Sequence, residues 1–260
     1  MTPPTHALAP DRLCLVVDDL DQAAAHARSL GFTLTPEGEH MVGSRNRCVM
    51  LRGGQYLELL DPHATVPDPA SQAYERRLRR FGEGLAVLSL RCEDLHALAE
   101  TWRQAGFNPS PVRPYSRTID LPTGRTEARF ELIQLPHPPL PGVPSLAICA
   151  CRQLTPDVVW RPDCLDHPNG AAALTGLELY SDAPHKDASV LSHLTQIPWH
   201  PTPTGPDLTL GTVRIHLRHT TRRRPIVQPA VLTLESPCPI SRAALCGTEL
   251  LASEGDERPK

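Results

Sequence analysis

Aromatic residues are scarce in this sequence: Phe, Tyr and Trp together make up 4% of its 260 residues, so the core must be built from Leu, Val, Ala and Ile. No apolar run reaches the roughly 18–20 residues that a membrane span needs. Residues 1–10 lack the basic and apolar regions of a secretory signal, which predicts a cytoplasmic protein. The 26 Lys and Arg nearly balance the 29 Asp and Glu, so we expect neither a nucleic-acid nor a membrane partner.

The common motifs of nucleotide, serine-hydrolase and zinc-protease sites are also absent: there is no G-x-G-x-x-G, Walker A, G-x-S-x-G or H-E-x-x-H pattern. None of the eight cysteines forms a C-x-x-C pair, and several lie in apolar runs. Buried reduced thiols are therefore expected, with a zinc cluster or a nucleophile as the alternatives. The 29 prolines, about twice the average usage, argue against a helical bundle.

An internal repeat is the most informative feature that is present. Arg12–Phe32 aligns without a gap to Val87–Phe107, and eight of the 21 positions are identical. Each copy reads as a short buried strand, an acidic pair that can cap a helix, about three helical turns, and a glycine that can end the helix. The expected strands are Leu13–Val17 and Leu85–Leu90, and the expected helices are Leu20–Leu30 and Leu95–Ala105.

Each copy continues into three further predicted strands, which gives a β-α-β-β-β module. In the first module these are Phe32–Glu37, Arg47–Arg52 and Gln55–Leu60, with a glycine hairpin turn between the last two; in the second they are Phe107–Val112, Ala128–Leu135 and Ser145–Ala150. The predicted fold class is α+β, in which the paired modules curl one sheet around a pocket.

The sequence divides into one large and one small predicted unit. The expected boundaries are a domain over 11–170 with modules 11–62 and 84–153 and a linker helix over 71–80, a partial third module over 171–236, and a flexible tail over 237–260. The linker helix is basic, and its charges fit a solvated face better than an anion site.

The motifs of the first unit resemble, in order, those of the glyoxalase-like domain family of the vicinal oxygen chelate superfamily. They are Asp11–Leu15 followed by Asp19-Leu20, a G-x-H-x-x-G-S/T-x-N segment at Gly38–Asn46, Tyr56–Leu59, Leu154–Pro162 and His167–Ala171. The resemblance covers roughly residues 11–182. It implies paired β-α-β-β-β modules around a small-molecule pocket, often with a divalent metal.

The same resemblance places four metal ligands on the first and last strands of the two modules. The first position holds Arg12, which has no lone pair to give, and the third holds Val87. The second holds Glu58. The fourth falls on or just after Ser145–Ala150, where Cys149, Cys151 and Gln153 stand and relatives often carry His in place of Gln153. We therefore expect no metal and no cofactor, and an Arg12–Glu58 ion pair in the metal's place.

Six residues are the candidates for the site. Glu58 and His40 are the expected catalytic residues, and Arg12, Asn46, Arg117 and Gln153 are expected to bind substrate. His40 and Asn46 are expected in a loop, and Arg117 at the pocket mouth. Structural alternatives stay open for each: a purely structural ion pair, a loop held by its own hydrogen bonds, and a surface salt bridge.

The expected function is a small-molecule enzyme of the lyase or isomerase type, acting on a carbonyl or carboxylate compound without the usual metal. A non-catalytic binding protein of the bleomycin-resistance type and a degenerate interaction domain are the alternatives. The expected partner is a small-molecule ligand, with a homodimer as one possible assembly.

Overall fold

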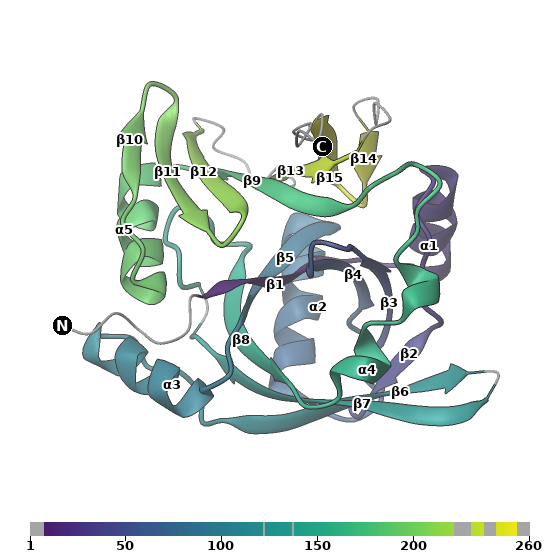
Figure 1. Cartoon of the computed structure of the whole chain (residues 1–260). Helices are drawn as coiled ribbons and strands as arrows, with labels where there is room; N and C mark the ends of the chain where they lie inside the picture. The colour runs from purple at the N-terminus through teal and green to yellow at the C-terminus, as the bar shows by residue number, and fades with distance from the viewer. Residues whose placement is uncertain (1–7, 122, 137, 221–229, 237–242, 254–260) are drawn as a thin grey trace, which may run out of the picture.

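The computed structural model describes residues 8–121, 123–136, 138–220, 230–236 and 243–253, which form two curved sheets with helices on their outer faces (Figure 1). The first half contains β1 (Ala9–Val16), α1 (Leu20–Ser29), β2 (Gly38–His40), β3 (Arg45–Met50), β4 (Tyr56–Asp61), α2 (Pro69–Phe81), β5 (Gly84–Arg91), α3 (Leu95–Gln104), β6 (Arg113–Leu121), β7 (Gly124–Gln134) and β8 (Ala147–Gln153). The second half contains α4 (Pro156–Val159), a 3-10 turn η1 (Pro162–Cys164), β9 (Ala173–Ser181), α5 (Pro184–Thr195), β10 (His200–Thr202), β11 (Gly205–Leu210), β12 (Val213–His219), β13 (Ala230–Glu235), β14 (Ala243–Leu245) and β15 (Thr248–Ser253).

The two predicted copies of the strand–helix repeat are confirmed. Asp19 and Asp94 cap α1 and α3, and each side chain accepts a hydrogen bond of 2.9 Å from a backbone amide three residues on. Gly31 and Gly106 follow the two helices with φ of 82° and 88°, a conformation that glycine adopts without strain. The residues that the two copies share thus include those that begin and end each helix.

The two modules close into one barrel with the strand order β1-β4-β3-β2-β6-β7-β8-β5. In each module the first strand pairs in parallel with the last, β1 with β4 and β5 with β8. The modules then join along two antiparallel seams, β1 with β5 and β2 with β6. This is the curved sheet around a pocket that the α+β prediction described.

The second strand of each module was predicted wrongly. Residues 32–37 and 107–112 form no strand, and the paired segments are β2 and β6, which begin directly afterwards. Prolines at 36, 109 and 111 lack the amide hydrogen that a sheet ladder needs. Phe32 and Phe107 instead pack against the core as part of the connections.

Helix α2, predicted over 71–80, covers one end of the barrel (Figure 1). Arg76, Arg79 and Arg80 are exposed, as the interpretation of a solvated basic face predicts. Arg77 is not: it is 5% exposed and donates to the carbonyl oxygens of the Gly82 and Leu85 residues. The apolar face of the helix is buried through Leu78 and Phe81, so the linker helix packs against that end of the barrel.

The C-terminal segment holds more structure than expected. Residues 173–219 form a whole β-α-β-β-β set, and β13, which lies inside the predicted third module, joins β14 and β15 in the same sheet. The seven-stranded sheet has the order β10-β11-β12-β9-β13-β15-β14. The tail predicted as flexible therefore contains two paired strands, anchored by buried Leu245 and Leu250; its parts at 237–242 and 254–260 lie outside the described residues.

One hydrophobic cluster joins the barrel, the second sheet and helices α1, α3 and α5. Leu13, Leu88, Leu177 and Leu232 contribute to it from four different strands, and each is at most 1% exposed. Within the described ranges, no helix is both long and apolar enough to cross a membrane.

Candidate functional site

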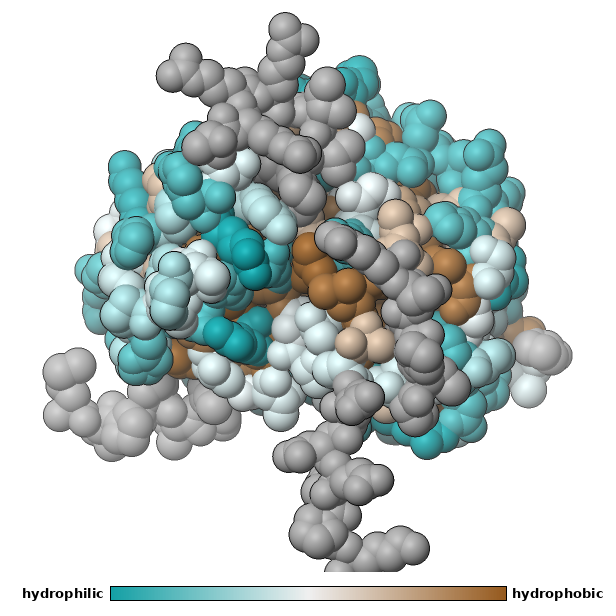
Figure 2. Space-filling view, turned by 90° about the horizontal axis from the view of Figure 1, so that it is seen from above, coloured by the Kyte–Doolittle hydropathy of each residue, from teal (hydrophilic) through white to brown (hydrophobic). Residues whose placement is uncertain are grey.

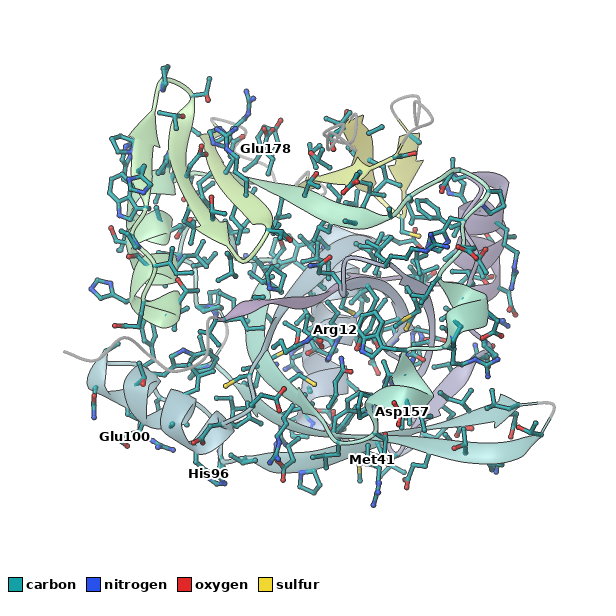
Figure 3. The ribbon with its side chains drawn as sticks, viewed as in Figure 1. Arg12, Met41, His96, Glu100, Asp157 and Glu178 are labelled. Carbon is teal, nitrogen blue, oxygen red and sulfur yellow. The ribbon has the colours of Figure 1, made fainter. Side chains whose placement is uncertain are left out.

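A cavity of about 310 Å³ lies inside the barrel and opens beside α2. Arg12, His40 and Glu58 form its polar end, while Asp68, which caps α2, and Tyr74 on α2 approach it from the helix side. Arg12 points into the middle of the barrel in Figure 3. Two clusters of buried apolar side chains, one with Met50 and Phe130 and the other with Val16 and Leu60, pack beside these polar groups.

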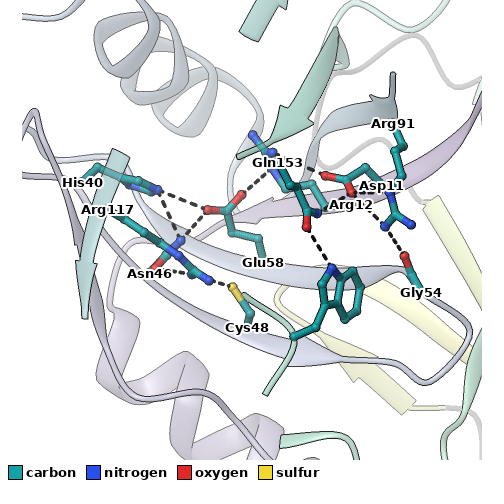
Figure 4. Close-up of polar contacts among 11 residues, drawn as sticks. Asp11, Arg12, His40, Asn46, Cys48, Gly54, Glu58, Arg91, Arg117 and Gln153 are labelled. Atoms are coloured by element: carbon teal, nitrogen blue, oxygen red, sulfur yellow. Dashed lines mark hydrogen bonds and ion pairs between the residues drawn. The ribbon is translucent and has the colours of Figure 1, made fainter. Parts of the chain in front are cut away.

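The predicted ion pair between Arg12 and Glu58 is present. Nε of Arg12 lies 2.9 Å from Oε2 of Glu58, with side-chain exposures of 15% and 6% (Figure 4). The pair is electrostatic, because Nε has no well-aligned hydrogen-bond partner within the described ranges. It follows from strand register: β1 and β4 run in parallel, and alternation turns both side chains into the barrel.

Asn46 links this pair to a second arginine. Its Nδ2 donates to Oε1 of Glu58 at 2.6 Å, and its Oδ1 accepts from Nη1 of Arg117 at 3.1 Å. The reversed amide would turn its oxygen toward the carboxylate and its NH₂ toward the guanidinium, so the charges on both sides fix its orientation. Arg117 also contacts the thiol of Cys48 at 3.1 Å.

His40 completes the polar cluster as a neutral imidazole. Burial, together with the nearby Arg117 and Arg12, lowers the pKa of His40 to about 4, against the opposing effect of Glu58. Its Nδ1 lies 3.0 Å from Oγ of Ser44, and its Nε2 lies 3.3 Å from Nδ2 of Asn46. Because Asn46 can only donate there, the proton is on Nδ1 and Nε2 carries the lone pair.

Glu58 is an ionised carboxylate near neutral pH. Burial by itself would raise its pKa, but Arg12, His40, the hydrogen bond from Asn46 and Arg117 together hold that pKa below its ordinary value. Burial and the surrounding groups thus act in opposite directions on the Glu58 pKa, and the four groups that lower it outweigh the burial that raises it.

Three of the predicted positions need correction. His40 and Asn46 lie on β2 and β3, in place of the expected loop between strands. Arg117 lies within β6, is 3% exposed and sits behind the cavity, in place of the expected mouth. Its register partner on β2 is His40, and β6 continues past it to Leu121.

Gln153 is turned away from the cavity. Its Nε2 donates to Asp11 at 2.8 Å, and its Oε1 accepts from Nε1 of Trp160 at 2.8 Å. Asp11 also binds Arg91 at 3.0 Å and lies 3.9 Å from Nη1 of Arg12 (Figure 4). Gln153 thus reaches the site only through Asp11, the residue next to Arg12.

The barrel does not offer a divalent metal the ligands that the resemblance implies. Strand register pairs Cys14 with Glu58 in one module and Ser89 with Cys149 in the other, so Cys149 takes the fourth position. Arg12, Glu58, Val87 and Cys149 all line the cavity, but only Glu58 and Cys149 can donate to a metal. Across the described ranges, no three His, Cys, Asp or Glu side chains are placed to hold one ion.

The thiols fit the prediction of buried reduced cysteines. All seven cysteines in the described ranges are free and buried, and Cys238 lies outside those ranges. Burial raises the pKa of Cys14 and of Cys149, the two thiols that line the cavity.

Sequence reasoning missed two tyrosines that line the cavity. Tyr115 places its ring 5.1 Å from that of His40, and burial raises its pKa to about 12 although Ser44 hydrogen-bonds it. Tyr74 approaches from α2, with its hydroxyl 3.5 Å from Nε2 of Gln134. The spacing of Ser71, Tyr74 and Leu78 is typical of an inward helix face and was the signal available.

The His167–Ala171 motif is structural. Nδ1 of His167 accepts from the Thr33 amide at 3.0 Å, and Nε2 donates to the Met50 carbonyl at 2.8 Å. The side chain of Asn169 donates to the Leu30 carbonyl at the end of α1. The motif fastens the connection between the two sheets to the barrel.

Solved structures share this fold. A hypothetical protein from Staphylococcus aureus is 11% identical, with a TM-score of 0.68 over 95% of this chain and 99% of that one. A triple mutant of 4-hydroxymandelate synthase from Streptomyces coelicolor gives 13% identity and a TM-score of 0.54 over 88% of this chain and 72% of that one. A xylose isomerase-like TIM barrel/4-hydroxyphenylpyruvate dioxygenase fusion protein is 15% identical, with a TM-score of 0.55. The match covers 91% of this chain and 38% of the fusion protein.

The fold and the cavity are those of a small-molecule enzyme or binding protein of the vicinal oxygen chelate superfamily. The model of the glyoxalase-like domain family matches residues 11–195, and the chain belongs to this family. No curated protein sequence matches the chain significantly.

Proposed function

We propose that the barrel binds a small compound with a carboxylate or an enolisable carbonyl group, and that Glu58 moves a proton on it in a metal-independent lyase or isomerase reaction. The observation that carries this proposal is the Arg12–Glu58 pair, 2.9 Å apart on the wall of a 310 Å³ cavity. A fixed guanidinium next to a carboxylate can take over the charge stabilisation that a metal supplies in other members of the superfamily.

The charges around the cavity favour an anion. A chain of contacts runs from Arg91 through Asp11, Arg12 and Glu58, and then by way of an amide to Arg117. It holds three guanidinium groups and two carboxylates, with His40 neutral, so its net charge is positive. Arg117 lies behind the cavity and the Arg91 side chain is 37% exposed, so the anionic group would bind chiefly to Arg12, whose guanidinium can take a carboxylate in a bidentate way.

The proposed proton transfer uses Glu58 and Arg12 together. A ligand oxygen bound to Arg12 shares the guanidinium with Glu58, which weakens the attraction that lowers the Glu58 pKa. Glu58 then takes a proton from the carbon next to the ligand carbonyl, and the electron pair moves to the carbonyl oxygen at Arg12. Return of the proton to another face or carbon gives an isomer, and expulsion of a leaving group from the neighbouring carbon gives a lyase product.

The second candidate is a binding protein without turnover, of the bleomycin-resistance type. The observation that favours it is the 2.6 Å hydrogen bond from Asn46 to Glu58, which together with Arg12 keeps the carboxylate a weak base. In that case the cavity would hold a ligand through Arg12 and the two tyrosines alone.

A thermal-shift screen of small carbonyl and carboxylate compounds separates these candidates. Ligands of the barrel raise the melting temperature of the wild type. They lose most of this effect in Arg12→Lys, where a compact ammonium replaces the planar guanidinium. Every ligand found is then incubated with the wild type and with Glu58→Gln, and products are followed by NMR. Turnover that Glu58→Gln abolishes supports the enzyme, and binding without turnover supports the second candidate.

Ligands that stabilise the wild type, Arg12→Lys and Glu58→Gln equally would contradict both candidates, because neither member of the pair would then contact them. Cys14→Ala is the matched control for folding, since it removes one thiol from the same wall and leaves both charges and both tyrosines in place.

A further inference from the structure

The second sheet repeats the strand pairing of the barrel residue by residue. In the barrel, Cys14 on β1 is the register partner of Glu58 on β4; in the second sheet, Glu178 on β9 is the partner of His216 on β12. In both units the next helix starts six residues after the first-strand partner, at positions 20 and 184. His216 therefore holds the position in the second sheet that Glu58 holds in the barrel.

The neighbouring strands support this equivalence. Cys14 also pairs with Val87 across the antiparallel seam, and Glu178 pairs there with Val231. On the other side, Asp207 of β11 stands opposite His216, at the position that Cys48 takes opposite Glu58. The face of the second sheet that carries His216 thus corresponds to the inner wall of the barrel.

Asp207 and His216 form a dyad on this face. Nδ1 of His216 contacts the carboxylate of Asp207, and a carboxylate can only accept, so this nitrogen carries a proton. The residue is 8% exposed, and its other nitrogen, Nε2, is buried without a hydrogen-bond partner in the part of the chain that the structure describes. A buried polar atom without a partner is costly, which points to a group that completes it.

Two arginines flank the dyad on the same side of β12. Arg214 and Arg218 lie two residues before and after His216, so strand alternation directs all three to one face. Arg214 is held by Asp207 at 2.7 Å and Arg218 by Glu178 at 2.6 Å. Their side chains are 62% and 44% exposed, which leaves them accessible to a solute.

His216, the two arginines and Glu178 line a groove of about 380 Å³, which also includes Thr233, and Asp207 holds His216 and Arg214 from outside its lining. Figure 2 looks onto this side of the molecule and shows hydrophilic side chains on the side of β10–β12, next to hydrophobic ones at the centre. Glu178 stands on this side of the second sheet in Figure 3, and Arg12 lies in the barrel on the other side. The groove and the barrel cavity are therefore separate.

We propose that this groove is a second small-molecule site, which takes a hydroxylated organic anion such as a hydroxycarboxylate. A hydroxyl group can donate or accept a hydrogen bond, so it can pair with Nε2 of His216 whether or not that nitrogen is protonated. The anionic group binds the guanidinium of Arg218 or Arg214, which their carboxylate partners hold in place. This site needs neither a metal nor the reaction proposed for the barrel.

The test compares L-malate with succinate, which differs only by the missing hydroxyl, by NMR titration of the full, uniformly isotope-labelled chain, in which both histidine side chains and backbone amides are observed. The His216 signal, identified by its loss in His216→Asn, is expected to shift with both compounds, and malate is expected to bind about three- to tenfold more tightly, as one hydrogen bond predicts. His216→Asn keeps a donor toward Asp207 but removes Nε2. In this variant, the shifts of neighbouring backbone amides should show malate and succinate binding equally.

Arg218→Gln is expected to weaken the binding of both malate and succinate about tenfold or more. Glu58→Gln should leave the His216 titration unchanged, so a failure of the barrel proposal and a failure of this one remain distinguishable. A His216 signal that does not move with malate at tens of millimolar, or an equal preference for malate in His216→Asn, overturns the second site.

Discussion

Arg12 and Glu58 meet across two parallel strands in the interior of the barrel, with Nε and Oε2 2.9 Å apart. Each neutralises a charge that the barrel could not otherwise hold at exposures of 15% and 6%. Neither residue is explained by packing alone, since the inward neighbours on both strands are apolar. The same two residues therefore stabilise the barrel by neutralising each other and supply the charged groups of the proposed site.

Removing one partner of the pair should cost far more stability than removing both. Arg12→Met leaves Glu58 buried beside a single amide donor, which we expect to lower the free energy of unfolding by about 3–5 kcal/mol. Arg12→Met combined with Glu58→Gln removes the uncompensated charge and should recover about half of this loss. Urea unfolding of the wild type, both single variants and the double variant gives the coupling energy; a value near zero would show that the two charges act independently.

Acidification should destabilise the protein through His40. The pKa of His40 is about 4 in the folded state, below its ordinary value of 6.5, so between these values the unfolded chain binds a proton that the folded chain does not. The stabilisation is full above pH 6.5 and is lost as the pH falls toward 4, by roughly 3 kcal/mol at most. Unfolding free energies measured from pH 7 to 4.5 should fall more steeply for the wild type than for His40→Gln. Parallel curves for the two proteins are the result that contradicts this assignment.

The two repeat-related glycines should respond differently to the same substitution. Both have positive φ, so Ala at either position costs about 1 kcal/mol. A Cβ on Gly31 would also lie 2.9 Å from Cβ of Asn169, whereas within the described ranges nothing lies within 4 Å of one on Gly106. Gly31→Ala should therefore destabilise by about 1–2 kcal/mol more than Gly106→Ala. Equal midpoints in urea would mean that the connection at Asn169 yields without cost.

The register equivalence of the four inner positions predicts that a metal site can be built. The variant Arg12→His, Val87→His, Cys149→Glu joins Glu58 with three new donors on converging strands. It should bind Ni²⁺ or Zn²⁺ in titration calorimetry, and the same variant with Glu58→Gln should bind at least about tenfold more weakly. We expect the wild type to contain less than one Fe, Ni, Mn or Zn per chain by elemental analysis. A full equivalent that Glu58→Gln removes would refute our assignment of the cavity.

Local chemistry in the sequence determined the parts of the fold that depend on neighbouring residues. The acidic caps at Asp19 and Asp94 and the glycines at 31 and 106 specify where two helices begin and end, and their repetition specifies two copies of one module. The Arg12–Glu58 pair was predictable from the family resemblance, which places both residues at metal-ligand positions of the module, and alternation along β1 and β4 directs both side chains to the same face.

Long-range pairing decided the rest. Pro36 is a local signal against a strand at 32–37, but which segment takes its place in the sheet depends on the pairing of β2 with β6. The pairing of β2 with β6 also buries Arg117 next to Asn46. Gln153 faces Asp11 and Trp160 because both are hydrogen-bond partners for its amide. The strands β14 and β15 form because β13 offers an edge and buries Leu250. Helix caps act within a few residues, whereas strand register and the burial of charge depend on partners far along the chain, which only the tertiary structure brings together.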